Sequence, residues 1–204
     1  MQSGFIDNIR VELTNILDFW QKKSMDNEHG GFVGRIDHFG TTIPKASKGI
    51  ILNTRILWTF SAASNFYKDD RYQNECTRAY VYLRDYFRDK EHSGIYWEVD
   101  YLGRPTNTRK QVYAQAFAIY ALSEYFKFSK KKEALNWAME LFGLIETKAL
   151  DLQFGGYTEA FNRNWDDIED MRLSEKDLNA PKTMNTHLHI LEAYANLYRV
   201  WHDK

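Results

Sequence analysis

An all-α fold built from helical hairpins is the architecture that this sequence predicts. Three observations indicate it: apolar residues recur with the period of an α-helix, Gly-rich stretches separate the periodic segments, and one helical pattern occurs three times. The periodic segments are expected to form helices at residues 3–23, 47–67, 71–88, 108–127, 130–147 and 183–202.

The Gly-rich connections carry short alternating segments bounded by glycine. They lie at residues 29–35, 93–105 and 154–157. Such segments are typical of small β-hairpins or extended loops, and they are too short for a central sheet. We therefore expect short β-hairpins in the loops of a helical protein.

An internal repeat defines the helical unit. Ala62–Lys68 matches Ala121–Lys127 at an offset of 59 residues, and Ala193–Arg199 matches again at an offset of 72. After the first two copies, a short polar loop leads into a returning helix, so the unit is a helical hairpin. After the third copy only His202–Lys204 remain. Because stacked repeats bury their faces only against neighbours, we expect either a longer chain or a second copy to cover this open edge.

Helical hairpins of this kind form either an α/α toroid, with inner helices lining a central cleft, or an open solenoid that binds other proteins. The repeat alone leaves both alternatives open. Aromatic residues make up 16% of the chain, including 13 Tyr, 13 Phe and 6 Trp. Sugars stack on such rings, which favours a carbohydrate cleft, although large rings also fill cores.

Size and charge exclude several classes of protein. The chain has 204 residues, enough for one domain or a large piece of a bigger one, and its net charge is −1. Neither nucleic acid nor an anionic membrane is an expected partner, and no apolar run reaches the ~20 residues of a membrane span. The N-terminus lacks the pattern of a signal peptide, and the single cysteine, Cys76, cannot form an internal disulfide. A cytoplasmic location is expected.

Polar residues form a stripe along the predicted helix 183–202. Asn185, His189, Glu192 and Asn196 follow spacings of four, three and four, which place them on one line of a helix. Such a stripe requires solvent or a ligand. His187 and His189 point ~200° apart, so they cannot bind one metal ion, and no metal site is expected. His189 either transfers a proton or contacts a substrate hydroxyl, or it is a core histidine bonded to Asn185 or Glu192.

Arg55 is the strongest single anomaly, because it is the only charge in the predicted helix 47–67 beyond its first turn. An unpaired guanidinium is costly to bury, so Arg55 must face a polar cleft or a partner such as Asp100 or Glu159. Tyr113, near the start of another helix, either hydrogen-bonds a ligand or fills the core.

The chain resembles the N-acylglucosamine 2-epimerase superfamily, and in particular its cellobiose-epimerising branch. The similarity rests on Leu-Asn-Thr-Arg, Arg-Lys-Gln-Val-Tyr-Ala-Gln-Ala-Phe and Met-Asn-Thr-His-Leu-His, and it spans nearly all of the chain. The matching stretches are residues 30–37, 51–64, 94–120, 171–177 and 185–189.

This resemblance implies an (α/α)6 barrel of which residues 1–204 form a single incomplete domain, the N-terminal half. It implies inversion of C2 at the reducing end of β-1,4-linked disaccharides, through ring opening and a cis-enediolate, with no metal or nicotinamide cofactor. Arg55 and His189 match catalytic residues of the family. Tyr113, Asn185 and Trp97 are the expected substrate contacts.

The resemblance covers only about half of the family's length. The remaining acid/base histidines, a glutamate and the sugar-stacking tryptophans of the family belong to its second half. We therefore expect this chain alone to be inactive or nearly so. The alternatives are a carbohydrate-binding or self-associating helical scaffold, with a homodimer through the open edge. A glycoside hydrolase using Asp100, Glu159 or Asp167 is a lesser option.

Overall fold

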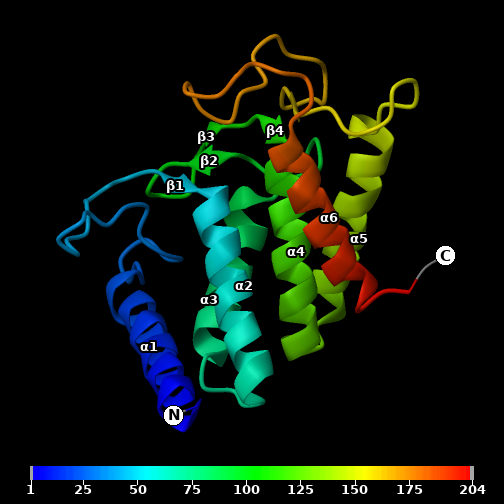
Figure 1. The fold of residues 1–204 in the computed structure, drawn as a ribbon. Helices are drawn as coiled ribbons and strands as arrows, with labels where there is room; N and C mark the ends of the chain where they lie inside the picture. The colour runs from blue at the N-terminus through cyan, green and yellow to red at the C-terminus, as the bar shows by residue number, and fades with distance from the viewer. Residues whose placement is uncertain (1, 203–204) are drawn as a thin grey trace.

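Six α-helices, arranged in two rows, form the part of the chain that the computed structural model describes, residues 2–202 (Figure 1). Their bounds are α1 (Gln2–Lys23), α2 (Ile50–Tyr67), α3 (Gln73–Tyr82), α4 (Val112–Ser129), α5 (Lys132–Leu144) and α6 (Met184–Tyr198). The inner helices α2, α4 and α6 pack side by side, whereas α3 packs mainly on α2 and α5 mainly on α4. The predicted helical hairpins are therefore confirmed.

The predicted helix boundaries were wrong at several ends. α3 and α5 each end in one π-helical turn, η1 (Leu83–Phe87) and η2 (Ile145–Ala149). The helices expected at 47–67 and 108–127 begin later, because the residues before them form the short strands β1 (Lys48–Gly49) and β4 (Lys110–Gln111). The backbone groups of these strands pair with strands from other loops, β1 with β2 and β4 with β5, and so do not join the helices.

All the strands lie in the loops at one end of the helices (Figure 1). β1 pairs antiparallel with β2 (Glu98–Val99), which pairs antiparallel with β3 (Pro105–Asn107). β4 pairs antiparallel with β5 (Ala160–Phe161). The hairpin expected within 93–105 is present as β2 and β3, while the other two Gly-rich stretches form only single bridges, Met25 with Phe32 and Leu150 with Tyr157.

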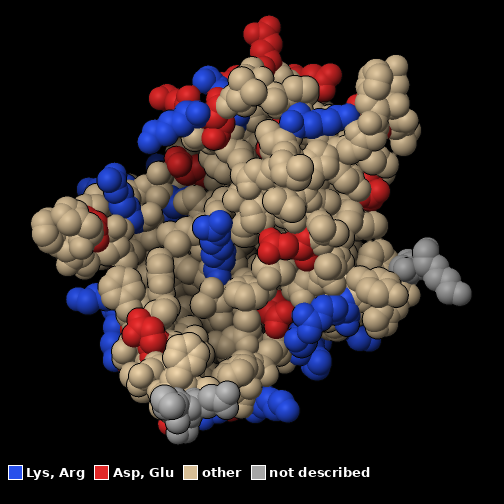
Figure 2. All heavy atoms as spheres, in the orientation of Figure 1, with Lys and Arg blue, Asp and Glu red and all other residues tan. Residues whose placement is uncertain are grey.

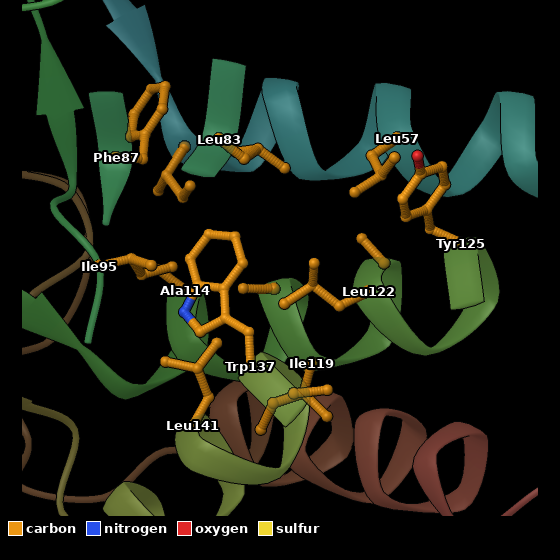
Figure 3. Packing of buried hydrophobic residues seen from close by; sticks show 14 of the residues in the cluster. Leu57, Leu83, Phe87, Ile95, Ala114, Ile119, Leu122, Tyr125, Trp137 and Leu141 are labelled. Carbon is orange, nitrogen blue, oxygen red and sulfur yellow. The ribbon is translucent and has the colours of Figure 1, made fainter. Parts of the chain in front are cut away.

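The hydrophobic core surrounds α4, which has neighbours on both sides. Figure 3 shows Ile119 and Leu122 of α4 between side chains of α2 and of the turn after α3, such as Leu57 and Leu83, and side chains of α5, such as Trp137. Several buried alanines of α4 allow the neighbouring helices to approach closely. No helix within residues 2–202 is long and apolar enough to cross a membrane.

An Asp–Lys pair closes the loop that precedes each inner helix. The three pairs, with their Nζ–Oδ2 distances, are Asp26–Lys48 (2.7 Å), Asp89–Lys110 (2.8 Å) and Asp151–Lys182 (2.6 Å). Each lysine also donates to a backbone carbonyl of its loop, at Gly30, Ser93 and Gly155. Each aspartate accepts from two backbone N–H groups that follow it. We call these three arrangements the Asp–Lys clips.

The clips correct the register of the sequence repeat. Each clip lysine lies two residues before its inner helix, so α2 and α4 align at an offset of 62 residues, and α4 and α6 at 72. The offset of 59 predicted for the first pair was wrong by nearly one helical turn. A shift of three or four residues keeps the same face of a helix aligned, so the apolar pattern fits both registers. Two residues that are 59 apart, Asn65 of α2 and Glu124 of α4, are instead in contact across the helix pair, because the Asn65 side chain donates to Glu124.

Candidate functional site

Three residues of equal rank on the inner helices form the centre of the candidate site. Arg55, Phe117 and His189 are each the sixth residue of α2, α4 and α6. Because these helices pack side by side and begin at the same end, residues of equal rank form one layer (Figure 1). The surface over α2, α4 and α6 carries few charged side chains (Figure 2).

The Phe117 ring brings the guanidinium and the imidazole together. The Cζ atom of Arg55 lies 5.0 Å from the centroid of this ring, and the centroid of the His189 imidazole lies 4.5 Å from it. A guanidinium at this distance is held by a cation–π interaction. Sequence reasoning missed Phe117, although its position four residues after Tyr113 places it on the same helix face.

Arg55 has no carboxylate partner within residues 2–202. Its side chain is exposed. The proposed partners Asp100 and Glu159 were wrong. Asp100 accepts the backbone N–H groups of Leu102 and Arg104, and Glu159 accepts the hydroxyls of Thr183 and Thr186. An exposed arginine without a carboxylate partner is suited to bind an oxyanion or a hydroxyl-rich ligand.

His189 is held in one orientation by Glu192. Its Nδ1 lies 2.7 Å from a carboxylate oxygen of Glu192, and its side chain is 24% exposed. Because a carboxylate only accepts hydrogen bonds, Nδ1 carries the proton and the lone pair of Nε2 remains available. The hydrogen bond between His189 and Glu192 that was expected of a core histidine is therefore present, but His189 is partly exposed rather than sealed in the core.

His187 points away from this layer, as the helix geometry predicts. Its Nε2 accepts the backbone N–H of Tyr157 at 2.9 Å, and its Nδ1 lies 2.7 Å from the carbonyl oxygen of Thr183. Nδ1 thus fixes the ring on its own helix, and Nε2 holds the loop at Tyr157 against α6. Within residues 2–202, no three His, Cys, Asp or Glu side chains gather as a metal site.

Tyr113 lies one turn above Phe117 and also touches His189. The two ring centroids are 4.8 Å apart, and the ring planes cross at 83°. Burial raises the pKa of Tyr113, and the positive charge of Arg55 offsets part of that rise. The phenol therefore stays protonated at neutral pH and can donate a hydrogen bond.

The described contacts do not bring the other two expected substrate contacts, Asn185 and Trp97, to Arg55, Phe117 and His189. Asn185 is exposed and, like Tyr113, is the second residue of its helix. Trp97 is half-buried before β2; its carbonyl accepts the N–H of Ile50, and its own N–H donates to Asn107. The described ring contacts of Tyr113, Phe117 and His189 do not include Trp97.

A second aromatic layer lies one turn further down the inner helices. Trp58 and Tyr120 are stacked, with their centroids 5.2 Å apart and their planes inclined by 14°. Together with Glu192 they border a hollow of about 250 Å³. Sequence reasoning missed this pair, although Trp58 follows Arg55 by three residues. Asn196 also borders this hollow, although it is mostly buried and its side chain donates to the carbonyl of Tyr120.

Sequence comparisons link the chain to sugar epimerases. A model of the N-acylglucosamine 2-epimerase (GlcNAc 2-epimerase) family matches residues 30–204. The cellobiose 2-epimerase of Bacteroides fragilis is 52% identical over 190 residues, which are 93% of this chain and 48% of that protein. The cellobiose 2-epimerase of Ruminococcus albus is 44% identical over 195 residues, 95% of this chain and 49% of that protein. The chain thus spans about half the length of these curated relatives.

Structural comparison gives the same result. The structure of cellobiose 2-epimerase from Bacillus thermoamylovorans superimposes with a TM-score of 0.94 at 45% identity, covering 100% of this chain and 52% of that one. The expected architecture, about half of an (α/α)6 barrel with short β-hairpins in its loops, is confirmed.

Proposed function

The chain belongs to the N-acylglucosamine 2-epimerase family, and we propose that it forms one wall of a site that inverts C2 of the reducing-end glucose of cellobiose and related β-1,4-linked disaccharides. The observation that carries this proposal is the contact of Arg55 and His189 with the same ring, Phe117. The reaction needs a positive charge that stabilises the enediolate and an imidazole that moves the C2 proton, and both groups lie here beside one apolar ring.

The reaction first needs a group that holds negative charge. When the opened sugar loses its C2 proton, the C–H electron pair becomes a C1–C2 double bond and the C1 carbonyl pair moves onto O1. The resulting enediolate is stabilised by donors aimed at its oxygens. Arg55 suits that role because its guanidinium is exposed and has no carboxylate partner within residues 2–202.

The reaction also needs a group that moves the C2 proton. The free Nε2 of His189 accepts the proton in this proposal, and Glu192 stabilises the imidazolium that forms through its bond to Nδ1. Tyr113 contacts the imidazole and donates its hydroxyl to the sugar. The Trp58–Tyr120 stack offers apolar faces to the sugar ring.

Inversion requires proton transfer on both faces of C2. The helices α2, α4 and α6 form one wall, so their side chains approach a sugar from one side. We therefore expect the 204-residue chain alone to convert little or no cellobiose to glucosyl-mannose. A carbohydrate-binding domain without chemistry is the second candidate function, and the aromatic stack favours it.

Two assays test the proposal. The purified chain and the full-length B. fragilis relative are incubated with cellobiose under the same conditions, and glucosyl-mannose is measured. Turnover by the chain equal to that of the relative would contradict the one-wall interpretation.

Binding of cellobiose is followed in parallel by tryptophan fluorescence. We expect saturable binding that Arg55→Ala abolishes. The control Arg84→Ala removes an arginine that pairs with its neighbour Asp85 and lies over the Tyr80 ring, and it should bind as the wild type does. If cellobiose causes no change, or if both variants bind equally, the site assignment is wrong.

A further inference from the structure

The fourth residue of each inner helix carries a side chain that bonds back to the start of its own helix. These residues are Asn53 of α2, Gln115 of α4 and His187 of α6. Each side chain lies within hydrogen-bond distance of the carbonyl oxygen four residues before it, at Gly49, Gln111 and Thr183. The three residues are 62 and 72 apart, the offsets that also relate the clip lysines, so one structural position recurs in the three units.

In the second and third units this side chain also holds the preceding loop. Oε1 of Gln115 accepts the backbone N–H of Ile95 at 3.0 Å, and Nε2 of His187 accepts that of Tyr157 at 2.9 Å. Ile95 and Tyr157 have equivalent places, since each forms an isolated β-bridge to the residue that follows a π-helical turn. We call these two contacts the loop latches. The same contact is thus made once by a carboxamide and once by an imidazole.

Only the His187 latch can be changed by a proton. A carbonyl oxygen only accepts hydrogen bonds, so the bond to Thr183 places the imidazole proton on Nδ1 and leaves the lone pair of Nε2 for Tyr157. A second proton binds to Nε2 and makes it a donor, which then faces the N–H of Tyr157. The backbone packs tightly here, since a Cβ atom on Gly156, whose φ is +75°, would lie 2.6 Å from Nε2. The loop must therefore move away when the ring is protonated.

Three carboxylates lie on the elements around His187, and each already accepts other hydrogen bonds. Glu159 accepts two threonine hydroxyls, Asp151 accepts the Lys182 ammonium, and Glu146 accepts two tyrosine hydroxyls. Burial raises the pKa of Glu159 and a charge on His187 opposes that rise, so attraction between the two favours the protonated ring. Among the described residues, none of these carboxylates bonds Nε2. The second proton therefore finds no acceptor while the loop stays in place.

We propose that the His187 latch is a pH-sensitive contact: a proton taken from solvent onto Nε2 detaches the loop at Tyr157 from α6, whereas the Gln115 latch stays in place. The His187 side chain is partly exposed, so solvent reaches the ring. Mild acid thus frees the loop beside the first turns of α6, the helix that also carries His189.

Amide hydrogen exchange measured by NMR tests both latches in one sample. The protection factors of the Tyr157 and Ile95 amides, corrected for the intrinsic effect of pH on exchange, are followed from about pH 7.5 to about pH 5 beside the His187 ring signals. We expect the protection of Tyr157 to fall roughly two- to tenfold as His187 takes up its proton, because that is the contribution of one hydrogen bond. The protection of Ile95 should stay constant.

A variant places the latch of the second unit in the third. In His187→Gln the protection of the Tyr157 amide should not change over this pH range. The control His38→Gln replaces an exposed histidine of the first loop and should keep the wild-type dependence on pH. Protection of Tyr157 that is constant in the wild type, that falls together with that of Ile95, or that falls equally in His187→Gln would each overturn the proposal. The comparison of Tyr157 with Ile95 needs only the wild type, and since no sugar is present, the results do not depend on the proposed reaction.

Discussion

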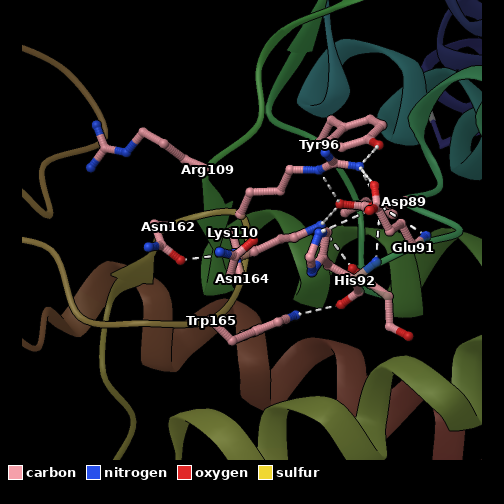
Figure 4. A network of polar contacts seen from close by, with 12 residues as sticks. Asp89, Glu91, His92, Tyr96, Arg109, Lys110, Asn162, Asn164 and Trp165 are labelled. Carbon is pink, nitrogen blue, oxygen red and sulfur yellow. Dashed lines mark hydrogen bonds and ion pairs between the residues drawn. The ribbon is translucent and has the colours of Figure 1, made fainter.

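The middle Asp–Lys clip and the last one contain the same groups at the same distances but in different surroundings. Asp89 and Lys110 are both 0% exposed, whereas Asp151 and Lys182 are 24% and 28% exposed. The middle clip has a hairpin on each side, and Figure 4 shows Asp89 and Lys110 within a network of polar side chains. Arg163 also bonds Asp89 at 2.9 Å. The last clip lies in the unit that contains the open edge. Neighbouring units, rather than the clip residues themselves, therefore decide how deeply such an ion pair is buried.

Burial changes the electrostatics of the two aspartates. Burial alone would raise the pKa of Asp89, but hydrogen bonds from Arg163 and Lys110 outweigh it and hold the pKa well below its usual value. In the last clip, the hydrogen bond from Lys182 lowers the pKa of Asp151 to about 2. Both carboxylates are thus ionised at neutral pH, but only the removal of Asp89 leaves a fully buried cation, Lys110, without its partner.

The largest expected effect is that of Asp89→Ala. It leaves the buried ammonium of Lys110 unpaired, which destabilises a fold by about 3–5 kcal/mol. Urea unfolding followed by circular dichroism measures this loss. Asp151→Ala is the matched variant, and it should shift the unfolding midpoint only slightly because water solvates Lys182. Equal shifts for the two variants would show that burial does not distinguish the clips.

A smaller effect is expected for Thr186→Val, which sharpens the comparison within the last unit. The hydroxyl of Thr186 is fully buried and donates to Glu159, whose pKa is raised by burial. Removing this donor leaves a buried carboxylate oxygen without its partner, at a cost of about 1–3 kcal/mol. The control Thr14→Val removes an exposed hydroxyl of α1 and should leave stability nearly unchanged. If both variants unfold alike, Glu159 does not hold α6 in place.

The smallest effect concerns acid. Because the folded pKa of Asp151 is depressed, its contribution to stability is fully present above the unfolded value of 3.8 and is lost as pH falls toward about 2. The difference in stability between the wild type and Asp151→Asn should therefore be constant above about pH 5 and shrink below about pH 4. Urea midpoints at pH 6, 4 and 3 measure it. A difference that widens in acid would mean that the pKa is raised instead.

Helices and their pairing were predictable because their signal is local. The six periodic segments appear within one or two turns of their predicted ends, and Arg55 stood out as a lone charge in an apolar helix. The clips were not predictable in the same way. Lys48 and Asp26 are separated by a loop, and each resembles an ordinary surface charge until the fold brings them together. The same three-dimensional dependence explains why Asp100 and Glu159 were wrongly paired with Arg55.

The site itself shows what a repeat in the correct register reveals. With the offset of 62 residues, Arg55 aligns with Phe117, and Trp58 aligns with Tyr120. In that register Arg55, Phe117 and His189 are all the sixth residue of their helices, so the position of the Phe117 ring between the other two could be predicted. With the offset of 59, no such layer appears, because α2 is displaced by nearly one turn relative to α4.

The central claim is that Arg55 and His189 contact one sugar. Imidazole NMR signals test it most directly, because His187 and His189 lie on the same helix but face different surroundings. Addition of cellobiose should shift the signals of His189 and leave those of His187 in place, and Arg55→Ala should abolish the shift. Signals of His189 that stay unchanged at saturating cellobiose, or that shift equally in Arg55→Ala, would contradict the claim.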